Sequence, residues 1–481
     1  MHGYQWIDLA LPVLLCLVNA PEAGVLQTER FDAAPAWDGW NNRSTAFETR
    51  SIEQDFGYAA ERSVGDHPGA IGGLVTPIGV PAYYARPVKS SGFDEPLSAS
   101  GTLRVEPGAG NTLFGFFNAG TLNEWRTPNT VVFRINGRGE VFHVHIEFAT
   151  AKWRAGASVI GRYDSSADRM YPLEIPSGGT HTWAIAYDPE GAGGRGEIVA
   201  TFDEHRAVCP LADGFKTDGA TFDRFGILNV VKHADGPGTL WLGNLVINGE
   251  TTDLAQDPGW EGRGNRTRYE SGDVRPRFDF GYSATQHAGG VAPGEIGGLF
   301  FRGDCRYPEK LAYYGAMVGP LTLDRPIRAE GKFALRRGVT DSTTLFGFFH
   351  SRHSVLVNES QKYAYPLNFL GIAIEGPSSE GFFAYPVYRT HGDGHSSGIP
   401  AGSPRVYPDG ASHTWSLEFT PARGDVDDRI TLTVDEVSIH ISIDPADRNE
   451  GATFDRFGFI TPWIDGNGQV VYFDDLTFTS Q

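Results

Sequence analysis

The chain contains the same motifs twice, about one domain length apart. Three of them return after 232 residues, a spacing far longer than the ~20–50 residues of a solenoid repeat. It matches the length of a whole domain, so the sequence predicts a tandem duplication of one fold. Motifs that both copies keep are expected to be scaffold, and residues that one copy alone carries are candidates for a site. The pairs are Thr-Leu-Phe-Gly-Phe-Phe at 112–117 and 344–349, His-Thr-Trp at 181–183 and 413–415, and Gly-Ala-Thr-Phe-Asp-Arg-Phe-Gly at 219–226 and 451–458.

The two copies also open alike, which sets the expected domain limits. Pro-Ala-Trp-Asp-Gly at 35–39 has its counterpart in Pro-Gly-Trp-Glu-Gly at 258–262, and each is followed by Asn-Arg. The join near residue 250 is short and polar, which indicates closely coupled domains rather than a flexible linker. We expect a leader over residues 1–24, a first sandwich over 25–250 and a second over 251–481.

Within each copy the apolar residues alternate with a period of two. Residues 142–148, 183–187 and 430–435 follow this pattern, and turn residues such as Asn-Gly and Pro-Asp-Gly bound the runs. Helical periodicity is almost absent. Many short strands with no alternation of strands and helices predict an all-β chain of two antiparallel β-sandwiches of the jelly-roll kind.

The second half of each copy has a further recognisable order. It begins with His-x-Trp, continues through two alternating strands, the second ending in Asp, and reaches Phe-Asp-Arg-Phe-Gly and a final strand. This order resembles the C-terminal half of concanavalin A-like lectin and glucanase domains, including laminin-G-like modules. Such folds host lectins, glycosidases, polysaccharide lyases and adhesion modules, so function must be argued from the site. The chain has neither the Glu-x-Asp-x-Glu strand of the glucanases nor the Gln-x-His pattern of alginate-lyase jelly rolls.

Charge and the N-terminus bear on location and partners. The net charge of −19 makes the chain a poor non-specific ligand of nucleic acid or an anionic membrane. Residues 9–18 form an apolar run of signal-peptide length, although no Lys or Arg precedes it. A mis-assigned start codon or a buried N-terminal segment is the alternative. We expect a secreted, periplasmic or cell-envelope protein without a membrane span.

One strand of the first copy carries an unusual set of polar residues. Phe142 to Phe148 alternates, so that His143, His145 and Glu147 share the face opposite to the apolar residues. Side chains at such positions lie roughly 6–7 Å apart and can converge on one ligand. We therefore take these three residues as the candidate catalytic group.

Aromatic and basic residues flank this strand in the sequence. Aromatic rings stack on the apolar faces of sugars, and Arg binds carboxylate or sulfate groups with two parallel hydrogen bonds. Three interpretations stay open: a carbohydrate site, a zinc site of the His-x-His kind, and a solvated sheet face without function. The candidate substrate-binding residues in this copy are Trp125, Arg126, Arg134, Arg138, Trp153 and Arg154.

The second copy carries a different polar set. His350 and Arg352 follow the shared Leu-Phe-Gly-Phe-Phe strand, where the first copy has Asn118. The nearest counterpart of the His-x-His strand is 381–389, which includes Tyr385 and Arg389. This alignment places Phe383 and Tyr385 at the positions of the two histidines, so the two domains are not expected to be equivalent. His350, Arg352, Tyr385 and Arg389 complete the candidate substrate-binding set.

The candidate residues favour one kind of chemistry over another. A glycosidase needs two carboxylates about 5–10 Å apart, and this site offers only Glu147. A polysaccharide lyase needs a base and a cationic clamp, for which His143 or His145 and Arg134 or Arg126 are suitable. The leading hypothesis is a carbohydrate-directed protein that binds an acidic polysaccharide and, if it is catalytic, cleaves it as a lyase. The alternative is a non-catalytic carbohydrate-binding or adhesion module of the cell envelope.

Two further expectations concern metals and the doubled motifs. Ca²⁺ could bind acidic turns such as Asp-Gly-Asn at 465–467, although these are equally ordinary turns, and Zn²⁺ is the weaker hypothesis. In Phe-Asp-Arg-Phe-Gly we expect Asp to accept backbone N–H groups and Arg to join two loops. The Trp of each His-Thr-Trp is expected in the core.

Overall fold

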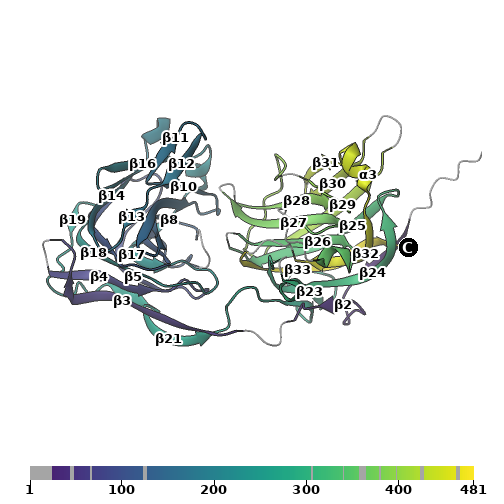
Figure 1. The fold of residues 1–481 in the computed structure, drawn as a ribbon, viewed down its shortest axis with the longest axis horizontal. Helices are drawn as coiled ribbons and strands as arrows, with labels where there is room; N and C mark the ends of the chain where they lie inside the picture. Colours follow the sequence, from purple (N-terminus) through teal and green to yellow (C-terminus); the bar gives the residue numbers. More distant parts are fainter. Residues whose placement is uncertain are drawn as a thin grey trace, which may run out of the picture.

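The computed structural model describes residues 24–43, 48–65, 68–122, 127–304, 307–339, 341–356, 365–378, 381–396, 398–422, 427–461 and 466–481. These residues form two β-sandwiches that lie side by side (Figure 1). The prediction of an all-β chain of two antiparallel sandwiches is confirmed.

Sandwich one consists of two facing sheets, which we call the β14 sheet and the β8 sheet. In the β14 sheet the strand order is β16 (His205–Pro210), β15 (Glu197–Phe202), β14 (Thr180–Asp188), β6 (Leu97–Val105), β18 (Gly238–Ile247), β4 (Pro68–Val75), β3 (Arg50–Ser63) and β21 (Arg266–Ser271), and β19 (Glu250–Thr251) pairs with β18. In the β8 sheet the order is β10 (Ala155–Val159), β9 (Val141–Ala149), β8 (Thr130–Arg138), β7 (Asn111–Phe117), β17 (Phe222–Asn229), β5 (Tyr83–Ser91) and β20 (Glu261–Arg263), and β13 (Ile175–Pro176) pairs with β9. A separate hairpin joins β11 (Gly161–Asp164) to β12 (Arg169–Pro172).

Sandwich two repeats this plan with the β25 sheet and the β27 sheet. The β25 sheet has the order β22 (Asp279–Ser283), β23 (Glu295–Phe301), β33 (Gly468–Ser480), β25 (Ile327–Arg337), β29 (Ser412–Thr420), β30 (Arg429–Val434) and β31 (Val437–Ser442), and β1 (Val25–Glu29) pairs with β33. The β27 sheet has the order β2 (Asp38–Trp40), β24 (Tyr313–Thr322), β32 (Thr453–Ile460), β26 (Thr343–Phe349), β27 (Phe369–Ser378) and β28 (Gly381–Arg389). The helices are short: α1 (Gly191–Gly194), α2 (Phe215–Asp218), α3 (Pro445–Glu450), and the 3₁₀ turns η1 (Pro308–Lys310) and η2 (His353–Val355).

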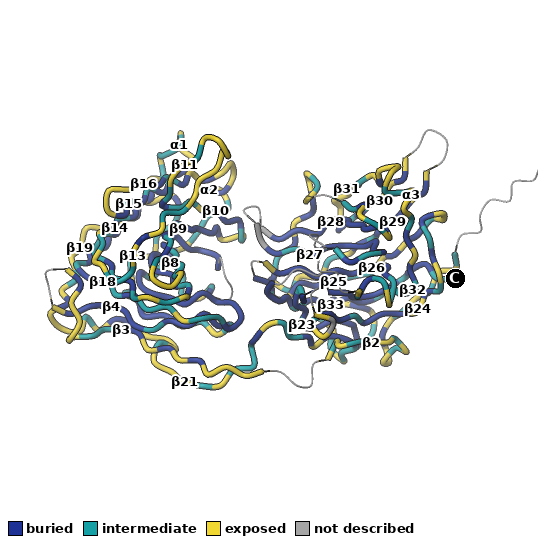
Figure 2. Tube along the Cα trace, viewed as in Figure 1, coloured by how far each residue is buried: buried dark blue, intermediate teal, exposed yellow. Residues whose placement is uncertain are grey.

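Apolar side chains fill the space between the two sheets of each sandwich, so the middle of each strand is buried and the loops are exposed (Figure 2). Trp183 and Trp415 are 2% and 4% exposed, and their rings lie 5.0 and 5.9 Å from those of Phe114 and Phe346. These pairs occupy equivalent positions in the two copies. The expectation that the repeated Trp belongs to the core is therefore met.

The segments that open the two copies cross between the sandwiches. We call residues 24–43 arm one and residues 250–266 arm two. Arm one supplies β1 and β2, which pair with β33 and β24 of sandwich two. Arm two supplies β20, which pairs with β5 of sandwich one. The division at residue 250 stays a prediction, but the pairing shows that the opening segment of each copy completes the sheet of the other sandwich.

Both arms use the same contacts. Asn42 Nδ2 donates to the carbonyl of Phe280 at 2.6 Å, and Asn265 Nδ2 donates to that of Phe56 at 2.6 Å. The acceptors belong to the Asp-Phe-Gly-Tyr motif that occurs in both copies at 55–58 and 279–282. Arm and acceptor were thus duplicated together.

The Phe-Asp-Arg-Phe-Gly motif holds each arm in place. Arg456 Nε lies 2.8 Å from Asp38 Oδ1 of arm one, and Arg224 Nε lies 2.9 Å from Glu261 Oε2 of arm two. The neighbouring aspartates accept backbone N–H groups, as Asp455 does from Ser351 at 2.7 Å. The structural interpretation of this motif agrees with these contacts.

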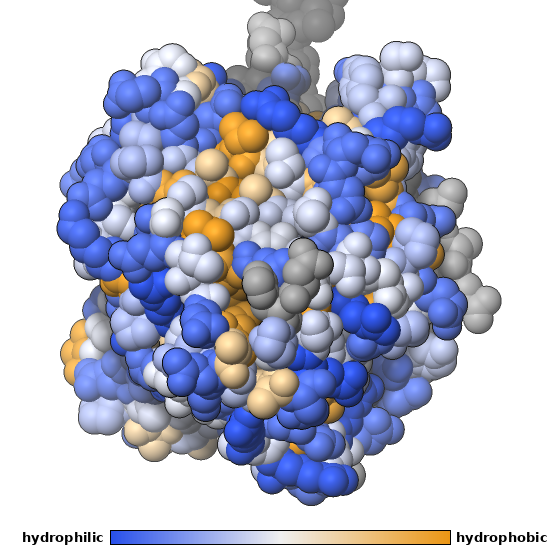
Figure 3. Space-filling model, turned by 90° about the vertical axis from the view of Figure 1, so that its left-hand side faces the viewer, coloured by the Kyte–Doolittle hydropathy of each residue, from blue (hydrophilic) through white to orange (hydrophobic). Residues whose placement is uncertain are grey.

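Two surface features complete the fold. Among the described residues, no helix has the length and apolarity needed to cross a membrane. The face of sandwich one that is turned away from sandwich two is mainly hydrophilic, with hydrophobic side chains in small separate patches (Figure 3). That face belongs to the β14 sheet, whereas the predicted site lies on the β8 sheet, on the side of sandwich one nearer to sandwich two (Figure 1).

Candidate functional site

Strand β9 presents its residues as the alternation predicts. Phe142, Val144, Ile146 and Phe148 are at most 2% exposed and belong to the core. His143, His145 and Glu147 point to the opposite, outer face of the β8 sheet, and the two imidazole centroids lie 6.4 Å apart. We call these three residues and the β8 residues beside them the β9 strip.

The strip contains an ion pair that the sequence did not reveal. Arg134 on β8 pairs across the strands with His145, and its Nε lies 2.6 Å from Glu147 Oε1. Its Nη1 donates to Asn111 Oδ1 at 3.0 Å. The Glu147 side chain is 5% exposed and that of Arg134 is 13% exposed. Because the two charges balance within a buried pair, neither group stands free as a nucleophile or an anion clamp.

Both imidazoles of the strip are held in the neutral form. Burial lowers the pKa of His145 to about 4, and the charge of Arg134 adds to this effect. Burial and Arg138 also lower the pKa of His143. The Nε2 atom of His145 is buried and has no hydrogen-bond partner within the described ranges. A buried polar atom without a partner is costly, so a ligand that bonded this nitrogen would gain affinity there.

The strip borders an apolar area on the same outer face. Leu113, Phe117 and Val132 point outward from β7 and β8 yet are at most 5% exposed. Residues of β5, of β17 and of the segment after β7 continue the area, which includes Tyr83, Ala85, Leu122, Leu228 and Val230. Sequence reasoning missed this area and also Asn111 and Asn136, although outward Asn136 directly opposes His143 on β8. The outward positions of β7 and β8 were the signal that could have identified Asn111, Asn136 and part of the apolar area.

The other predicted residues of sandwich one do not join the strip as a group. Arg138 is exposed at the end of β8. Trp153 stacks on Tyr407 of sandwich two, with ring centroids 5.7 Å apart. Arg154 is ion-paired with Asp218 and is 10% exposed, a structural position. Trp125 and Arg126 lie outside the described residues. Substrate-binding roles for these five residues stay a prediction.

Sandwich two has different residues at the positions of the strip. Strands β26, β27 and β28 pair in the same register as β7, β8 and β9 of sandwich one. Across the first set the row of paired residues is Leu345, Ala373 and Tyr385. Across the second set the row is Leu113, Arg134 and His145. Tyr385 therefore occupies the position of His145. By the same register, Phe383 takes the position of His143, as the sequence predicted, and Val387 takes that of Glu147.

Tyr385 and Arg389 are bonded inside sandwich two. The Tyr385 hydroxyl donates to Glu375, which also pairs with Arg302 at 3.2 Å. Burial raises the pKa of Tyr385 well above its usual value, so the phenol stays protonated. Arg389 is fully buried, and its Nη1 donates to the carbonyl of Tyr365 at 3.1 Å. These contacts give both residues a structural role whether or not a substrate reaches them.

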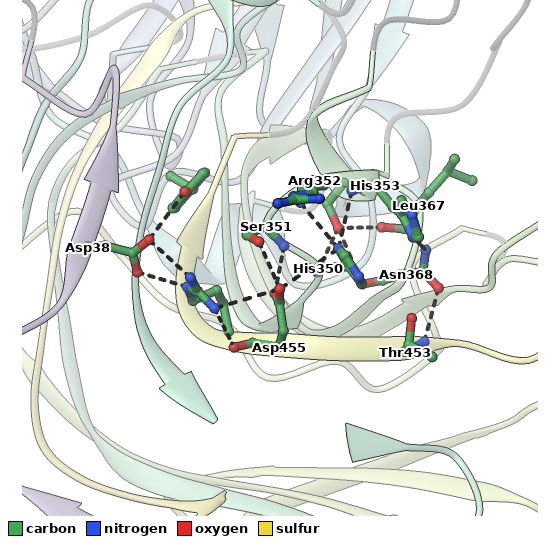
Figure 4. A network of polar contacts seen from close by, with 12 residues as sticks. Asp38, His350, Ser351, Arg352, His353, Leu367, Asn368, Thr453 and Asp455 are labelled. Atoms are coloured by element: carbon green, nitrogen blue, oxygen red, sulfur yellow. Dashed lines mark hydrogen bonds and ion pairs between the residues drawn. The ribbon is translucent and has the colours of Figure 1, made fainter. Parts of the chain in front are cut away.

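The remaining predicted residues, His350 and Arg352, lie in the loop after β26. His350 Nδ1 accepts from the backbone N–H groups of Arg352 and His353 at 3.2 and 3.3 Å (Figure 4). Arg352 is exposed. The imidazole of His353 lies beside that of His350, and the imidazole of His391 lies beside that of His353.

The described residues provide no set of ligands for the predicted calcium or zinc site. No group of three or more His, Cys, Asp or Glu residues is arranged there to hold a metal ion. Of the acidic turn at 465–467, residue 465 lies outside the described residues. Calcium and zinc therefore stay untested predictions.

Comparison with known proteins identifies no family. No family model and no curated protein matches this chain. Among solved structures, the mouse laminin alpha1 chain domains LG4-5 match over 88% of this chain and 94% of theirs, with 13% identity and a TM-score of 0.26. The carbohydrate recognition domain of Emp47p (11% identity) and the alginate lyase Aly36B (12% identity) each match 42% of this chain and 88% of theirs, both with a TM-score of 0.27.

These similarities concern the fold and say nothing of function. The neighbours agree with the predicted resemblance to tandem laminin-G-like, concanavalin A-like domains. The strand pairing described above shows two antiparallel β-sandwiches in tandem. In architecture, this chain is similar to tandem laminin-G-like sandwiches.

Proposed function

We propose that this protein is a secreted carbohydrate-binding protein and that the outer face of the β8 sheet is its main binding face. The observation that carries the proposal is the buried Nε2 of His145, which has no hydrogen-bond partner among the described residues and lies beside the Arg134–Glu147 pair and an apolar area. A sugar ring combines hydroxyl groups with apolar C–H faces. The polar strip can bond the hydroxyl groups, and the apolar residues beside it, which are at most 7% exposed, give it a water-poor border. A few polar groups in an apolar surround are typical of small-ligand sites.

Binding is favoured over cleavage by the electrostatics of the strip. A lyase needs positive charge to stabilise the developing enolate, but the charge of Arg134 is already balanced by Glu147. An imidazole with a pKa of about 4 is also a weak base at neutral pH. A glycosidase would need a second carboxylate near Glu147. We therefore propose a binding function, with cleavage of an acidic polysaccharide as the alternative to be tested beside it.

The secretion part of the proposal is supported by the apolar run at residues 9–18. Secretion would bring the protein to the polysaccharides of the cell envelope or the medium. N-terminal sequencing of the protein recovered from the medium or the periplasm tests this point. A mature N-terminus close to residue 24 supports secretion, and an intact residue 1 in a cytosolic fraction argues against it.

A glycan array with parallel assays for unsaturated uronates and new reducing ends tests the function. Alginate and other acidic polysaccharides belong on the array, beside neutral glycans. The informative variant is His145→Gln, and the matched control is His205→Gln, whose side chain is 44% exposed on β16 of the other sheet. We expect binding without product, roughly tenfold weaker in His145→Gln and unchanged in His205→Gln.

Each other result has a clear meaning. Product that disappears in His145→Gln while binding persists would show catalysis. Absence of binding and of product with every glycan would refute a carbohydrate function.

A further inference from the structure

Three imidazoles gather at one end of sandwich two, where sandwich one has none. His350 and His353 take the positions of Asn118 and Thr121, by the 232-residue offset. His391 takes that of Ala151, because its backbone N–H donates to Gly451 O at 2.8 Å just as that of Ala151 donates to Gly219 O at 2.8 Å. We call His350, His353 and His391 the imidazole trio.

The trio is packed as a unit. The rings of His350 and His353 are stacked with centroids 4.0 Å apart and planes 14° apart, and the ring of His391 lies 5.2 Å from that of His353. The trio belongs to three segments of the fold, namely the loop after β26, η2 and the loop after β28. It lies at one end of the β27 sheet and is separate from the outer face that carries Tyr385.

Hydrogen bonds determine which nitrogen of each ring carries the proton. The side-chain oxygen Oδ1 of Asn368 accepts the backbone N–H of Thr453 at 3.0 Å. The side-chain NH₂ of Asn368 therefore faces the two imidazoles, 3.2 Å from Nδ1 of His391 and 3.5 Å from Nδ1 of His353. Nδ1 of His350 accepts two backbone N–H groups, as described above. On this network, each Nδ1 is an acceptor and each neutral ring carries its proton on Nε2.

The three Nε2–H groups are therefore donors that the described residues do not use. None of them has a hydrogen-bond partner among the residues that the structure describes. His391 is exposed and the other two rings are partly exposed, so the donors are accessible. Burial lowers the pKa of His353, and the neighbouring His350 and His391 lower it further, which keeps this ring uncharged.

A cavity beside His391 supplies the complementary acceptors. Its volume is about 250 Å³, slightly below the ~300–1,000 Å³ usual for ligand pockets. The bond from Thr390 lowers the pKa of Glu450, and the ion pair with Arg448 lowers that of Asp324, so both carboxyls are ionised. The cavity is lined by Thr322, Asp324, Asn368, His391, Arg448 and Glu450, among others, and His391 is the member of the trio that lines it.

This lining selects for one class of ligand. A sugar hydroxyl accepts one hydrogen bond and donates another, so it can bridge an imidazole N–H and a carboxylate. An acidic sugar would bring a negative charge close to Glu450, which is unfavourable, whereas the charge of Asp324 is already balanced by Arg448 at 2.8 Å. We propose that the trio and this cavity form a second site, which binds the terminal residue of a neutral glycan through its hydroxyl groups; the ligand class rests on the proposed carbohydrate function.

The contacts that hold the loop of His350 and His353 have counterparts in sandwich one. The imidazoles do not, so they are the feature that sandwich two alone carries. Asp38 of arm one pairs with Arg456, Arg456 lies 3.6 Å from Asp455, and Asp455 holds the loop through Ser351 (Figure 4). In sandwich one, Asp223 holds the backbone of Ala119 in the same way at 3.0 Å. Scaffold contacts and His350, which accepts two backbone N–H groups, therefore hold the loop, so His353 and His391 are the donors to replace.

The experiment combines binding with a direct observation of the rings. In ¹⁵N-imidazole NMR spectra of the full chain, methyl glycosides of neutral sugars should shift the Nε2 signals of the trio. Affinity for the same glycosides should fall roughly tenfold or more in the double variant His353→Gln/His391→Gln, because two N–H donors are lost. His205→Gln, whose side chain is 44% exposed on β16 and lies outside both sites, is the matched control and should leave this binding unchanged.

The outcomes separate this inference from the proposed function. If glycans still bind on the array but no neutral glycoside shifts the trio signals, the second site is refuted and the proposed function stands. Shifts produced only by uronates, sulfate or Zn²⁺ would overturn the neutral-sugar assignment. If no glycan binds at all, the proposed function fails, and the second site fails with it. An unchanged melting temperature of the double variant excludes loss of folding as the cause of weaker binding.

Discussion

Replacing Trp37 by Ala should destabilise the sandwich that lies more than two hundred residues further along the chain. Trp37 belongs to arm one, yet its ring packs against Phe31, Tyr314 and Phe478, with centroids 5.6, 5.6 and 6.2 Å away. Truncation of a fully buried Trp costs about 3–5 kcal/mol, and Trp37 is only partly buried. We expect a loss of about 2 kcal/mol, which corresponds to roughly 30-fold faster amide exchange through local opening.

Hydrogen exchange measured by mass spectrometry locates the effect. Peptides from β24 and β33 should exchange faster in Trp37→Ala, while those from β5 and β17 should not change. The matched variant is Trp260→Ala in arm two, whose ring stacks on Tyr84 at 5.9 Å and is 8% exposed. In Trp260→Ala, peptides from β5 and β17 should exchange faster, while those from β24 and β33 should not change. Faster exchange in β5 and β17 for Trp37→Ala would refute the crossing of the arms.

Three further predictions concern the strip and the join. Glu147→Gln should cost about 3–5 kcal/mol in urea unfolding, because Arg134 keeps a buried charge without its partner, whereas Glu106→Gln, in a more exposed pair with Arg104, should cost about 1 kcal/mol or less. The folded pKa of His145, about 4, lies below the unfolded value of 6.5, so the unfolded chain binds more protons between these values and stability should fall by about 3 kcal/mol from pH 6.5 to 4. His145→Gln should lose that part of the pH dependence in the same unfolding assay, and an unaltered slope would contradict the burial of the ring. Cleavage at a protease site engineered into residues 272–278 should leave two fragments that co-elute in size exclusion, and deletion of arm one should separate them.

The sequence predicted those features that depend on local alternation and on the repeat. The period of two predicted that the side chains of His143, His145 and Glu147 share one face of the sheet. The repeat predicted that Tyr385 occupies the position in sandwich two that His145 occupies in sandwich one. The doubled Phe-Asp-Arg-Phe-Gly motif was interpreted correctly because both copies retain it.

Contacts between distant segments could not be predicted in this way. Nothing in the pattern of β9 indicates that Glu147 meets Arg134, because the partner depends on which strand lies beside it and in which register. The ion pair of Arg154 with Asp218 joins residues that are 64 positions apart. The arms were expected to belong to the copy that they open, since their motifs precede it. Which sheet edge a strand completes is a tertiary property and leaves no local signal.

The crossing of the arms means that the polypeptide passes between the sandwiches twice. One passage leads from Arg43, bridged to Asp279, to Arg50 on β3, and the other leads from Ser271 on β21 back to β22. Two tethers suppress the swivelling that a single linker allows. The spacing between the β9 strip and the imidazole trio is thereby restricted, so a glycan long enough to reach both would find its second contact at an effective concentration set by the architecture and not by random motion of a linker.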